Sequence, residues 1–226
     1  MRLLDLYCGA GGAAMGYHKA GYEVVGVDIN PQPHYPFEFH QADALDYLEA
    51  HGREFDVIHA SPPCQLYTGM RRITLARFGH VPDHPDLIAV TRRGLLKNGK
   101  PFVIENVQNS PLHTQFILCG AALGLPHVAR HRHFESNVLF LGIPKCNHLK
   151  QPYTIGVYGE RPDGRRVSYR QYRLCRIARS LNEAQELMEI DWMDWNEIRN
   201  AIPLRYTEFI GKQLIILGFI SQGGEG

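Results

Sequence analysis

The chain has 226 residues, of which 44% are hydrophobic and 21% are charged, and its formal net charge at pH 7 is +1. A chain of this length buries a sizeable core without cross-links, and its near-neutral charge excludes nucleic-acid binding through bulk charge alone. The five cysteines are an odd number and form no Cys-x-x-Cys pair, which argues against a disulfide framework and indicates a reducing, intracellular setting.

Two further classes are excluded by short patterns. Asp5 interrupts the first apolar residues, and the apolar run 214–217 is too short for a bilayer, so we expect a cytoplasmic protein with no membrane segment. Cys146-Asn147-His148 offers two metal-ligand types, but no second pair follows at zinc-finger spacing. We therefore expect a surface loop there and no metal.

Short apolar runs alternate with helical patterns over the first two thirds of the chain, which predicts an α/β fold with a doubly wound, mostly parallel sheet. Strands are expected at 3–7, 23–27, 37–40, 56–60, 101–105 and 138–141. Helices are expected at 13–20, 44–51, 85–97 and 114–123. Pro85 in a first turn and Asn98-Gly99 at the end mark the third helix.

The rhythm changes at residue 143, where Pro-, Tyr- and Arg-rich sequence begins and leads to an amphipathic stretch at 181–188. We expect residues 143–195 to form a small separate region, and 1–142 with 196–222 to form the main domain. The main domain ends in an apolar helix over 206–217, and 223–226 is expected to be a flexible tail.

A glycine turn follows the first expected strand. Gly9-Ala10-Gly11-Gly12 lets the backbone approach a ligand closely, and Asp28 lies 19 residues after Gly9, where an acid binds ribose hydroxyls. Asp5 would repel a pyrophosphate but tolerate a cationic methionine tail, which favours S-adenosylmethionine over a dinucleotide. The alternative is that the glycines only allow close packing of helix and strand.

The segment Ser61-Pro62-Pro63-Cys64-Gln65 follows the apolar run 56–60. Each proline fixes a backbone angle, so Cys64 is held ready to act as a nucleophile. Glu105, in Val103-Ile104-Glu105-Asn106-Val107, ends the fifth expected strand. A buried structural thiol and a strand-end charge pair are the respective alternatives.

Together these motifs resemble the cytosine-C5 DNA methyltransferases, in particular the short prokaryotic or phage type associated with restriction-modification. The resemblance covers most of the chain in the family's order: DLYCGAGG at 5–12, Asp28, Asp43, SPPCQ at 61–65, ENV at 105–107, Arg130-His131-Arg132, and 202–214. Val128 and Lys212 depart from the family's usual glutamine and asparagine, and the recognition segment is shorter than usual.

The resemblance implies a Rossmann-like, S-adenosylmethionine-dependent methyltransferase fold with a reduced recognition region in 143–195. It implies methyl transfer to carbon 5 of cytosine in DNA through a covalent cysteine adduct. The catalytic residues it implies are Cys64 as nucleophile, Glu105 at ring nitrogen 3, Arg132 at the carbonyl oxygen, and Arg130 supporting the loop or a phosphate. The cofactor residues it implies are Asp5, Tyr7, Cys8, Gly9, Gly11, Gly12, Asp28, Ile29, Asp43, Ala44, Pro62 and Gln213. Asp43 would contact the adenine amino group, and its alternative is a helix N-cap before Ala44.

The chemistry requires a cytosine flipped out of the duplex or already unpaired. Loop 66–79 is a candidate basic lid over the backbone, and arginines with interleaved tyrosines follow in 161–179. The expected nucleic-acid contacts are Gln65, Arg71, Arg72, Arg165, Arg166, Arg170 and Arg173. Solvated arginines, in part salt-bridged to the acids at 183–194, are the alternative.

Three other functions remain open at this point. The same chemistry on tRNA or other RNA fits the short recognition region. A non-catalytic module is the second alternative, either a cofactor-binding partner of a larger enzyme or a decoy that holds DNA. For an active enzyme, an oligomer or a specificity partner is a further possible source of target recognition. An NAD-dependent oxidoreductase is the most distant alternative, because Cys64 and Glu105 have no role in hydride transfer.

Overall fold

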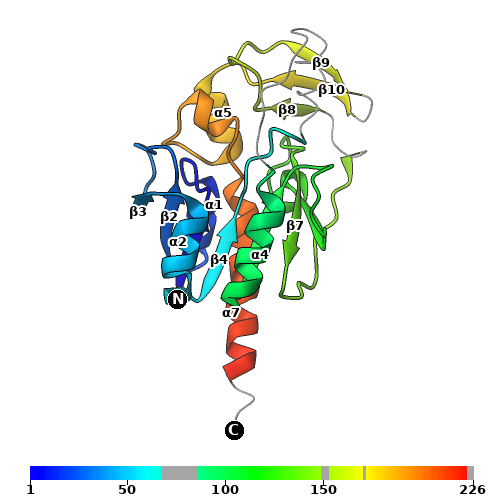
Figure 1. The fold of residues 1–226 in the computed structure, drawn as a ribbon. Coiled ribbons are helices and arrows are strands. Elements are labelled where there is room, and N and C mark those ends of the chain that lie inside the picture. The colour runs from blue at the N-terminus through cyan, green and yellow to red at the C-terminus, as the bar shows by residue number, and fades with distance from the viewer. Residues whose placement is uncertain (68–85, 149–152, 170–171, 223–226) are drawn as a thin grey trace.

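A computed structural model of the chain describes residues 1–67, 86–148, 153–169 and 172–222. Its centre is a seven-stranded sheet in the order β3-β2-β1-β4-β5-β7-β6 (Figure 1). The strands are β1 (Arg2–Leu6), β2 (Glu23–Asp28), β3 (Glu38–Gln41), β4 (Val57–Ala60), β5 (Phe102–Asn106), β6 (Phe116–Cys119) and β7 (His131–Ser136). The first five run parallel, and β7 is antiparallel to both of its neighbours.

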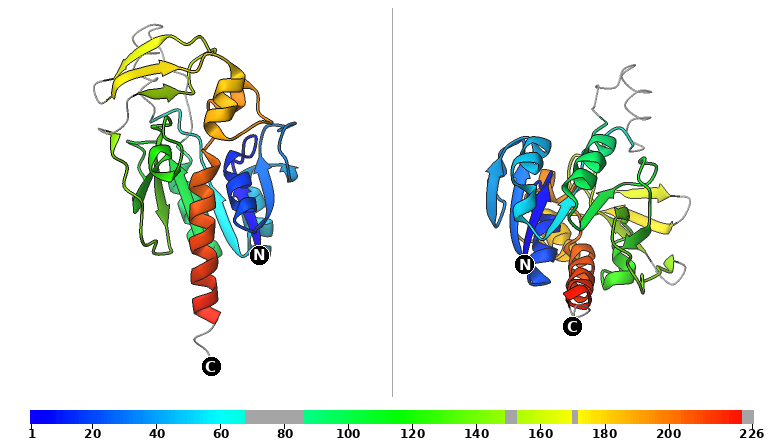
Figure 2. Two further views of the ribbon diagram at one scale, coloured as in Figure 1. Left: turned by 180° about the vertical axis from the view of Figure 1, so that it is seen from behind. Right: turned by 60° about the horizontal axis from the view of Figure 1, so that its bottom comes forward.

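Helices cover both faces of the sheet, as the doubly wound pattern predicts. Helices α2 (Ala44–His51) and α4 (Ile88–Asn98) pack together in front of the sheet in Figure 1. Helices α1 (Gly12–Lys19) and α7 (Leu204–Gln222) pack together on the other face, which faces the viewer in the reversed view of Figure 2. Of the helices in the described ranges, none combines the length and apolarity needed to cross a membrane.

Alternation along each strand divides the core into two layers. On β1, Leu3 joins the cluster beneath α1 and α7, whereas Leu4 and Leu6 join the cluster beneath α2 and α4. Strand side chains alternate between faces, so the apolar residues of β1 are buried on both sides of the sheet, as expected for a parallel sheet. Gly16 allows α1 and α7 to touch, because a Cβ there would lie 2.1 Å from the Leu204 carbonyl oxygen.

The expected strands at 3–7, 23–27, 37–40, 56–60 and 101–105 are confirmed to within a residue or two, and so are the helices at 13–20 and 44–51. Helix α4 ends at Asn98, where Gly99 takes the left-handed conformation that the Asn98-Gly99 pair predicts. The chain enters α4 through Asp86, whose carboxylate accepts a hydrogen bond from the Ile88 amide, whereas Pro85 lies outside the described residues.

Two predicted elements are wrong. Residues 114–123 were expected to form a helix, but they contain strand β6 and the short 3-10 helix η2 (Gly120–Leu123). Residues 138–141 were expected to form a strand but are irregular. The strand that comes last along the chain in this sheet is β7. Leu139 and Leu141 are 66% and 67% exposed, so these apolar residues are not core residues of a strand.

A smaller three-stranded sheet lies above the carboxyl ends of the parallel strands (Figure 1). It contains β8 (Thr154–Gly156), β9 (Arg166–Tyr169) and β10 (Tyr172–Ile177), and it is followed by α5 (Leu181–Met188) and α6 (Trp195–Ile198). The predicted amphipathic helix at 181–188 is confirmed as α5. These elements share one hydrophobic cluster with Ala10, Val128 and Leu204 of the main sheet region.

Candidate active site

The glycine turn joins β1 to α1 through several left-handed residues. Tyr7, Gly9 and Gly11 have φ values of 58°, 49° and 86°. At Gly11 a Cβ would lie 2.8 Å from the Pro36 ring, so both the backbone angle and the space require glycine. The turn therefore presents bare backbone at the carboxyl end of the central strand, which is the usual ligand position in such sheets.

Asp28 ties this turn to the end of β2. Its carboxylate accepts hydrogen bonds from the Gly9 amide at 3.1 Å and from the Asn30 amide at 2.9 Å. The next residue, Ile29, is 65% exposed. An apolar side chain left in water beside a fixed carboxylate suits a nucleoside, with the acid at the ribose and Ile29 against the base.

Asp5 is fully buried beneath the turn, and both of its carboxylate oxygens lack a hydrogen-bond partner among the described residues. Burial and the nearby Asp28 raise the pKa of Asp5 well above its usual range, and the Ala14 N–H, which lies near the carboxylate but does not meet hydrogen-bond geometry, opposes this shift only in part. An unpaired buried carboxyl is costly, so it is expected where a ligand supplies a cation or a donor.

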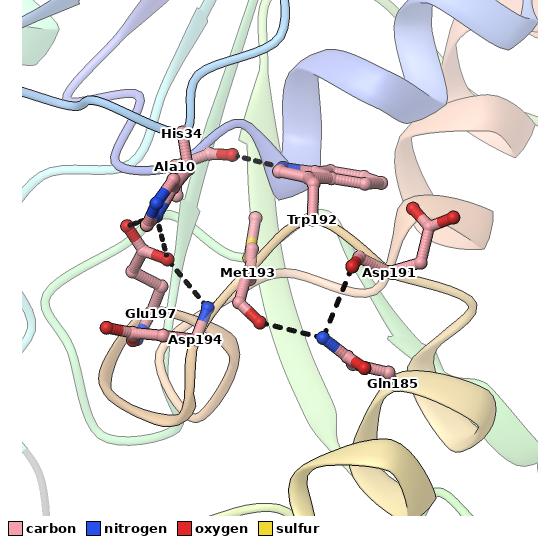
Figure 3. Close-up of polar contacts among 8 residues, drawn as sticks. All are labelled: Ala10, His34, Gln185, Asp191, Trp192, Met193, Asp194 and Glu197. Carbon is pink, nitrogen blue, oxygen red and sulfur yellow. Dashed lines mark hydrogen bonds and ion pairs between the residues drawn. The ribbon is translucent and has the colours of Figure 1, made fainter.

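A loop after α5 packs against the glycine turn. Trp192 donates an indole hydrogen bond of 2.8 Å to the Ala10 carbonyl oxygen, and His34 contacts Glu197 at 2.9 Å (Figure 3). The Glu197 side chain also accepts from the Asp194 amide and closes a capping box at the start of α6. The loop thus forms one wall of the turn.

The other residues expected to bind the cofactor lie next to the turn or at the start of α2. Cys8 and Ala44 are buried next to the turn and at the start of α2, whereas the Tyr7 hydroxyl lies 2.9 Å from Thr91 Oγ1. Asp43 is the N-cap of α2, because its carboxylate accepts from the Leu45 and Asp46 amides at 2.8 Å and 3.2 Å. This is the alternative weighed for Asp43, and the adenine contact stays a prediction.

Gln213 does not lie at the turn. Gly12 touches Ala201 and Ile202, just before α7 begins, whereas Gln213 lies about 13 Å further along α7 at about 1.5 Å per residue. Its amide group exchanges hydrogen bonds of 2.8 Å and 3.0 Å with the Leu141 backbone. The assignment of Gln213 to the cofactor site is therefore corrected: it fastens the 138–141 segment to α7.

The nucleophile candidate follows β4, next to the strand that carries the turn. Cys64 is partly buried, and its carbonyl oxygen accepts a 2.9 Å hydrogen bond from the Tyr67 amide. The Asn106 side chain donates a 2.8 Å hydrogen bond to the carbonyl oxygen of the buried Pro62. Asn106 therefore anchors the proline loop to the end of β5.

Glu105 and Arg132 face Cys64 from β5 and β7. Arg132 Nε lies 2.8 Å from Glu105 Oε1, but that oxygen has no partner with hydrogen-bond geometry among the described residues. Burial raises the pKa of Glu105 against the opposing effect of Arg132. Burial and the Glu105 charge raise the pKa of Cys64, and Arg132 lowers it. The three groups are thus electrostatically coupled.

A buried relay behind Glu105 was not predicted from the sequence. The Tyr17 hydroxyl lies 3.0 Å from His59 Nδ1, and His59 Nε2 lies 2.9 Å from Ser61 Oγ. A hydrogen bond from Ser61 lowers the pKa of Glu105. Burial lowers the pKa of His59 to about 3, so this imidazole stays neutral and links the two hydroxyl groups.

Arg130 lies close enough to the coupled group for the charges of Glu105 and Cys64 to act on its pKa, but its guanidinium is bound by backbone carbonyl groups. Its guanidinium donates to the backbone carbonyl oxygens of Val157, Arg199 and Ala201, and its own carbonyl oxygen accepts from Tyr206. Burial and Arg132 lower its pKa, and three carbonyl dipoles meet its charge. These contacts join the small sheet region to α7 and to the segment before it, and the expected role of Arg130 in supporting the loop or a phosphate stays a prediction.

The expected nucleic-acid contacts are only partly described. Arg71, Arg72 and Arg170 lie outside the described residues, as does loop 68–79, and Arg173 lies on β10. Gln65, Arg165 and Arg166 are exposed. A pocket of about 380 Å³ is lined by Tyr153, Thr154, Gly164, Arg166, Arg176 and Arg179. Arg176 is already paired with Glu183 at 2.5 Å, as the salt-bridged alternative predicts for one member of this set.

A second cluster was missed in the sequence. Cys119, His131, Cys146 and His148 converge at the far edge of the sheet, although the sequence offers only Cys146 and His148 as a close ligand pair, with no second pair at zinc-finger spacing. The absence of finger spacing was a poor guide, because strand pairing rather than chain proximity brings two of the four residues together.

No sequence-family model and no curated protein matches the chain. Solved structures do match its fold. A protein assigned as a DNA modification methyltransferase encoded within an E. coli prophage aligns with a TM-score of 0.61 and 16% identity, over 97% of this chain and 99% of that one. Spodoptera frugiperda DNMT2 aligns at 0.58 and 15%, over 96% and 99%. S. pombe Dnmt2 methyltransferase aligns at 0.58 and 14%, over 96% and 99%. The chain therefore has a Rossmann-like methyltransferase fold.

Proposed function

We propose that the chain is an S-adenosylmethionine-dependent methyltransferase that modifies carbon 5 of cytosine in DNA through a covalent adduct with Cys64. The observation that carries the proposal is the coupled group of Cys64, Glu105 and Arg132, which lies one strand from a glycine turn with an unpaired buried acid. The likeness in fold to a prophage protein assigned to DNA modification supports it.

The residues of the turn fit the cofactor. When bound, S-adenosylmethionine supplies an electrophilic methyl group on a sulfonium. Asp5 would accept from its ammonium group and so gain the partner that its carboxylate lacks. Asp28 would hold the ribose hydroxyls, and Ile29 would cover one face of the adenine.

The coupled group supplies the activation that cytosine needs. Cys64 as thiolate would form a bond from Sγ to carbon 6, and the electrons of the ring double bond would make carbon 5 nucleophilic. Glu105, whose pKa is raised by burial, would keep a proton to donate to ring nitrogen 3. Arg132 would donate to the carbonyl oxygen. After carbon 5 gains the methyl group, water or a base would take its proton, and the reformed double bond would expel Cys64.

The pocket beside Arg166 and Arg179 supports a role for the segment 143–195 in holding the nucleic-acid backbone. We include in the proposal that this segment is the reduced recognition region beside a catalytic unit of 1–142 and 196–222. RNA is the alternative substrate. A second copy of the chain or a specificity partner is the alternative source of target recognition.

The decisive experiment uses DNA that contains 5-fluorocytosine together with S-adenosylmethionine. Fluorine at carbon 5 cannot leave as a proton, so the adduct should accumulate and map by mass spectrometry to Cys64. Cys64→Ser should abolish trapping, whereas Cys175→Ser, at a buried cysteine on β10, should not.

Labelled-methyl transfer to duplex DNA and to total tRNA, run in parallel, would separate the two substrates. Label on tRNA alone would move the proposal to RNA. The absence of both label and adduct on either substrate, with cofactor binding intact, would instead support the non-catalytic alternative.

A further inference from the structure

Four side chains that no part of the proposed reaction uses converge on one point. Cys119 ends β6 and His131 begins β7, and the two are direct partners in the antiparallel register. Cys146 and His148 come from the segment that leaves the sheet after β7. The four ligand atoms all lie within 4.8 Å of one another.

Three of the six distances between the ligand atoms match a tetrahedral metal centre. His131 Nε2 lies 3.3 Å from Cys146 Sγ, Cys119 Sγ lies 3.6 Å from His148 Nε2, and the two Nε2 atoms lie 3.2 Å apart. Zinc bonds of about 2.3 Å to sulfur and about 2.0–2.1 Å to nitrogen place sulfur and nitrogen about 3.5 Å apart, and two nitrogens about 3.3 Å apart. The observed distances agree with both values within about 0.3 Å.

Hydrogen bonding alone explains the arrangement poorly. Thiols are weak donors and weak acceptors, and two neutral imidazoles that turn the same kind of nitrogen toward each other share at most one hydrogen bond. A disulfide between the two cysteines would give the two imidazole groups only a weak hydrogen-bond acceptor. A dication bound by two thiolates and two neutral imidazoles uses all four groups.

We propose that Cys119, His131, Cys146 and His148 bind one zinc ion in a closed, structural Cys2His2 site. Two sulfur and two nitrogen ligands in a tetrahedron select zinc over the oxygen-preferring cations. Four protein ligands leave no open position for water or substrate, so the ion acts on structure rather than on chemistry. On binding, both thiols lose their protons to solvent.

The site would fix the start of β7. Arg132 follows His131 on β7 and points to the opposite side because strand side chains alternate, and Arg130 comes directly before the strand. Arg132 makes the ion pair with Glu105, and Arg130 fastens β7 to the small sheet region. The metal would also hold residues 146–148 against the sheet edge, at the point where the chain leaves for that region. The four ligands are thus positioning residues for Arg132.

Metal content is the first test. The full-length, untagged protein, expressed with zinc in the medium and desalted, should contain one zinc per chain by inductively coupled plasma mass spectrometry. Substitution by Co²⁺ should give the strong visible bands of a tetrahedral ion and a thiolate charge-transfer band. Cys119→Ser with Cys146→Ser should lose both signals, whereas Cys175→Ser should retain them.

A wild-type protein that stays below one tenth of an equivalent of zinc after incubation with excess metal would overturn the proposal. So would a double variant that keeps full occupancy, or a Cys119–Cys146 disulfide found by mass spectrometry in freshly lysed cells. Because the double variant can fail to fold, His148→Ala provides a milder case at a half-buried ligand. It should weaken zinc affinity by at least tenfold in a competition with a chromogenic chelator, and unchanged affinity would count against the site.

Discussion

Replacing Asp5 by asparagine should change protein stability and cofactor affinity in opposite directions. The Asp5 carboxylate is fully buried, has no hydrogen-bond partner in the described ranges, and lies near the Asp28 charge. Asparagine has the same shape without the charge, so the unliganded Asp5→Asn protein should be more stable than the parent at neutral pH.

The gain should depend on pH in a defined way. Burial raises the pKa of Asp5 on folding, so the folded state keeps a proton that the unfolded state loses. Below the unfolded pKa of about 4 both states are protonated, and parent and variant should be equally stable. As the pH rises through the folded pKa, only the parent loses stability. Thermal unfolding measured from about pH 4 to about pH 8 should therefore show two diverging curves.

Affinity should move the other way. A hydrogen bond to a charged group contributes about 1.5–3 kcal/mol, so loss of the carboxylate should raise the Kd for S-adenosylmethionine roughly 10- to 150-fold in calorimetric titration. Asp46→Asn, at an exposed position on α2, is the matched control and should change neither quantity noticeably. An Asp5→Asn protein that is less stable than the parent, or that binds the cofactor equally well, would refute the assignment of Asp5 as an unpaired cofactor ligand.

Glu105→Gln should lower kcat/KM by about 10²–10³ at neutral pH and turn a bell-shaped pH profile into one that only rises. Burial raises the pKa of both Glu105 and Cys64. Activity should rise with pH as Cys64 loses its proton and fall at higher pH as Glu105 loses its own, so a fall that persists in the variant would contradict this assignment. Gly16→Ala should lower the unfolding free energy by about 1–3 kcal/mol through overpacking, because its Cβ would lie 2.1 Å from a carbonyl oxygen of α7. Gly218→Ala, with 3.8 Å of space, should stabilise by up to about 1 kcal/mol, and equal melting temperatures for the two variants would argue against close packing at Gly16. An arginine partner lowers the pKa of Glu183 to about 2, so Glu183→Gln should cost about 1–3 kcal/mol at neutral pH and progressively less as the pH falls from about 4 through about 2, as urea titrations at several pH values would show.

The parallel strands and their helices were predictable because strands buried on both faces have nearly continuous apolar sequences. The two strands at the antiparallel edge were not. In β6 only Phe116, Leu118 and Cys119 are buried, and the Gly-Ala-Ala-Leu that follows imitates a helix. The sequence of β7 is mostly polar, so it does not resemble a buried strand. Its charged residues have partners on other elements, as Glu135 has in Arg92. Such pairings become visible only in three dimensions.

The same reason limits what could be predicted of the site. Asp28 and Glu105 lie at the carboxyl ends of recognisable strands and Cys64 follows one, so their convergence at one edge of the sheet follows from topology. The relay through Tyr17 and His59 joins α1 to β4, and no spacing rule connects residues 42 positions apart. The backbone contacts of Arg130 could not be predicted either, because a motif places a residue beside a strand but does not tell which groups its side chain contacts.

The indole of Trp192 on the Ala10 carbonyl oxygen, and the hydrophobic cluster that Ala10 shares with Val128 and α5, have a consequence for protein engineering. Exchanging the small sheet region as a cassette cut at residue 143 and rejoined at 195 would remove one wall of the glycine turn and open part of the core. Chimeras meant to alter target choice should keep the native 181–204 and transplant only the strands that precede it.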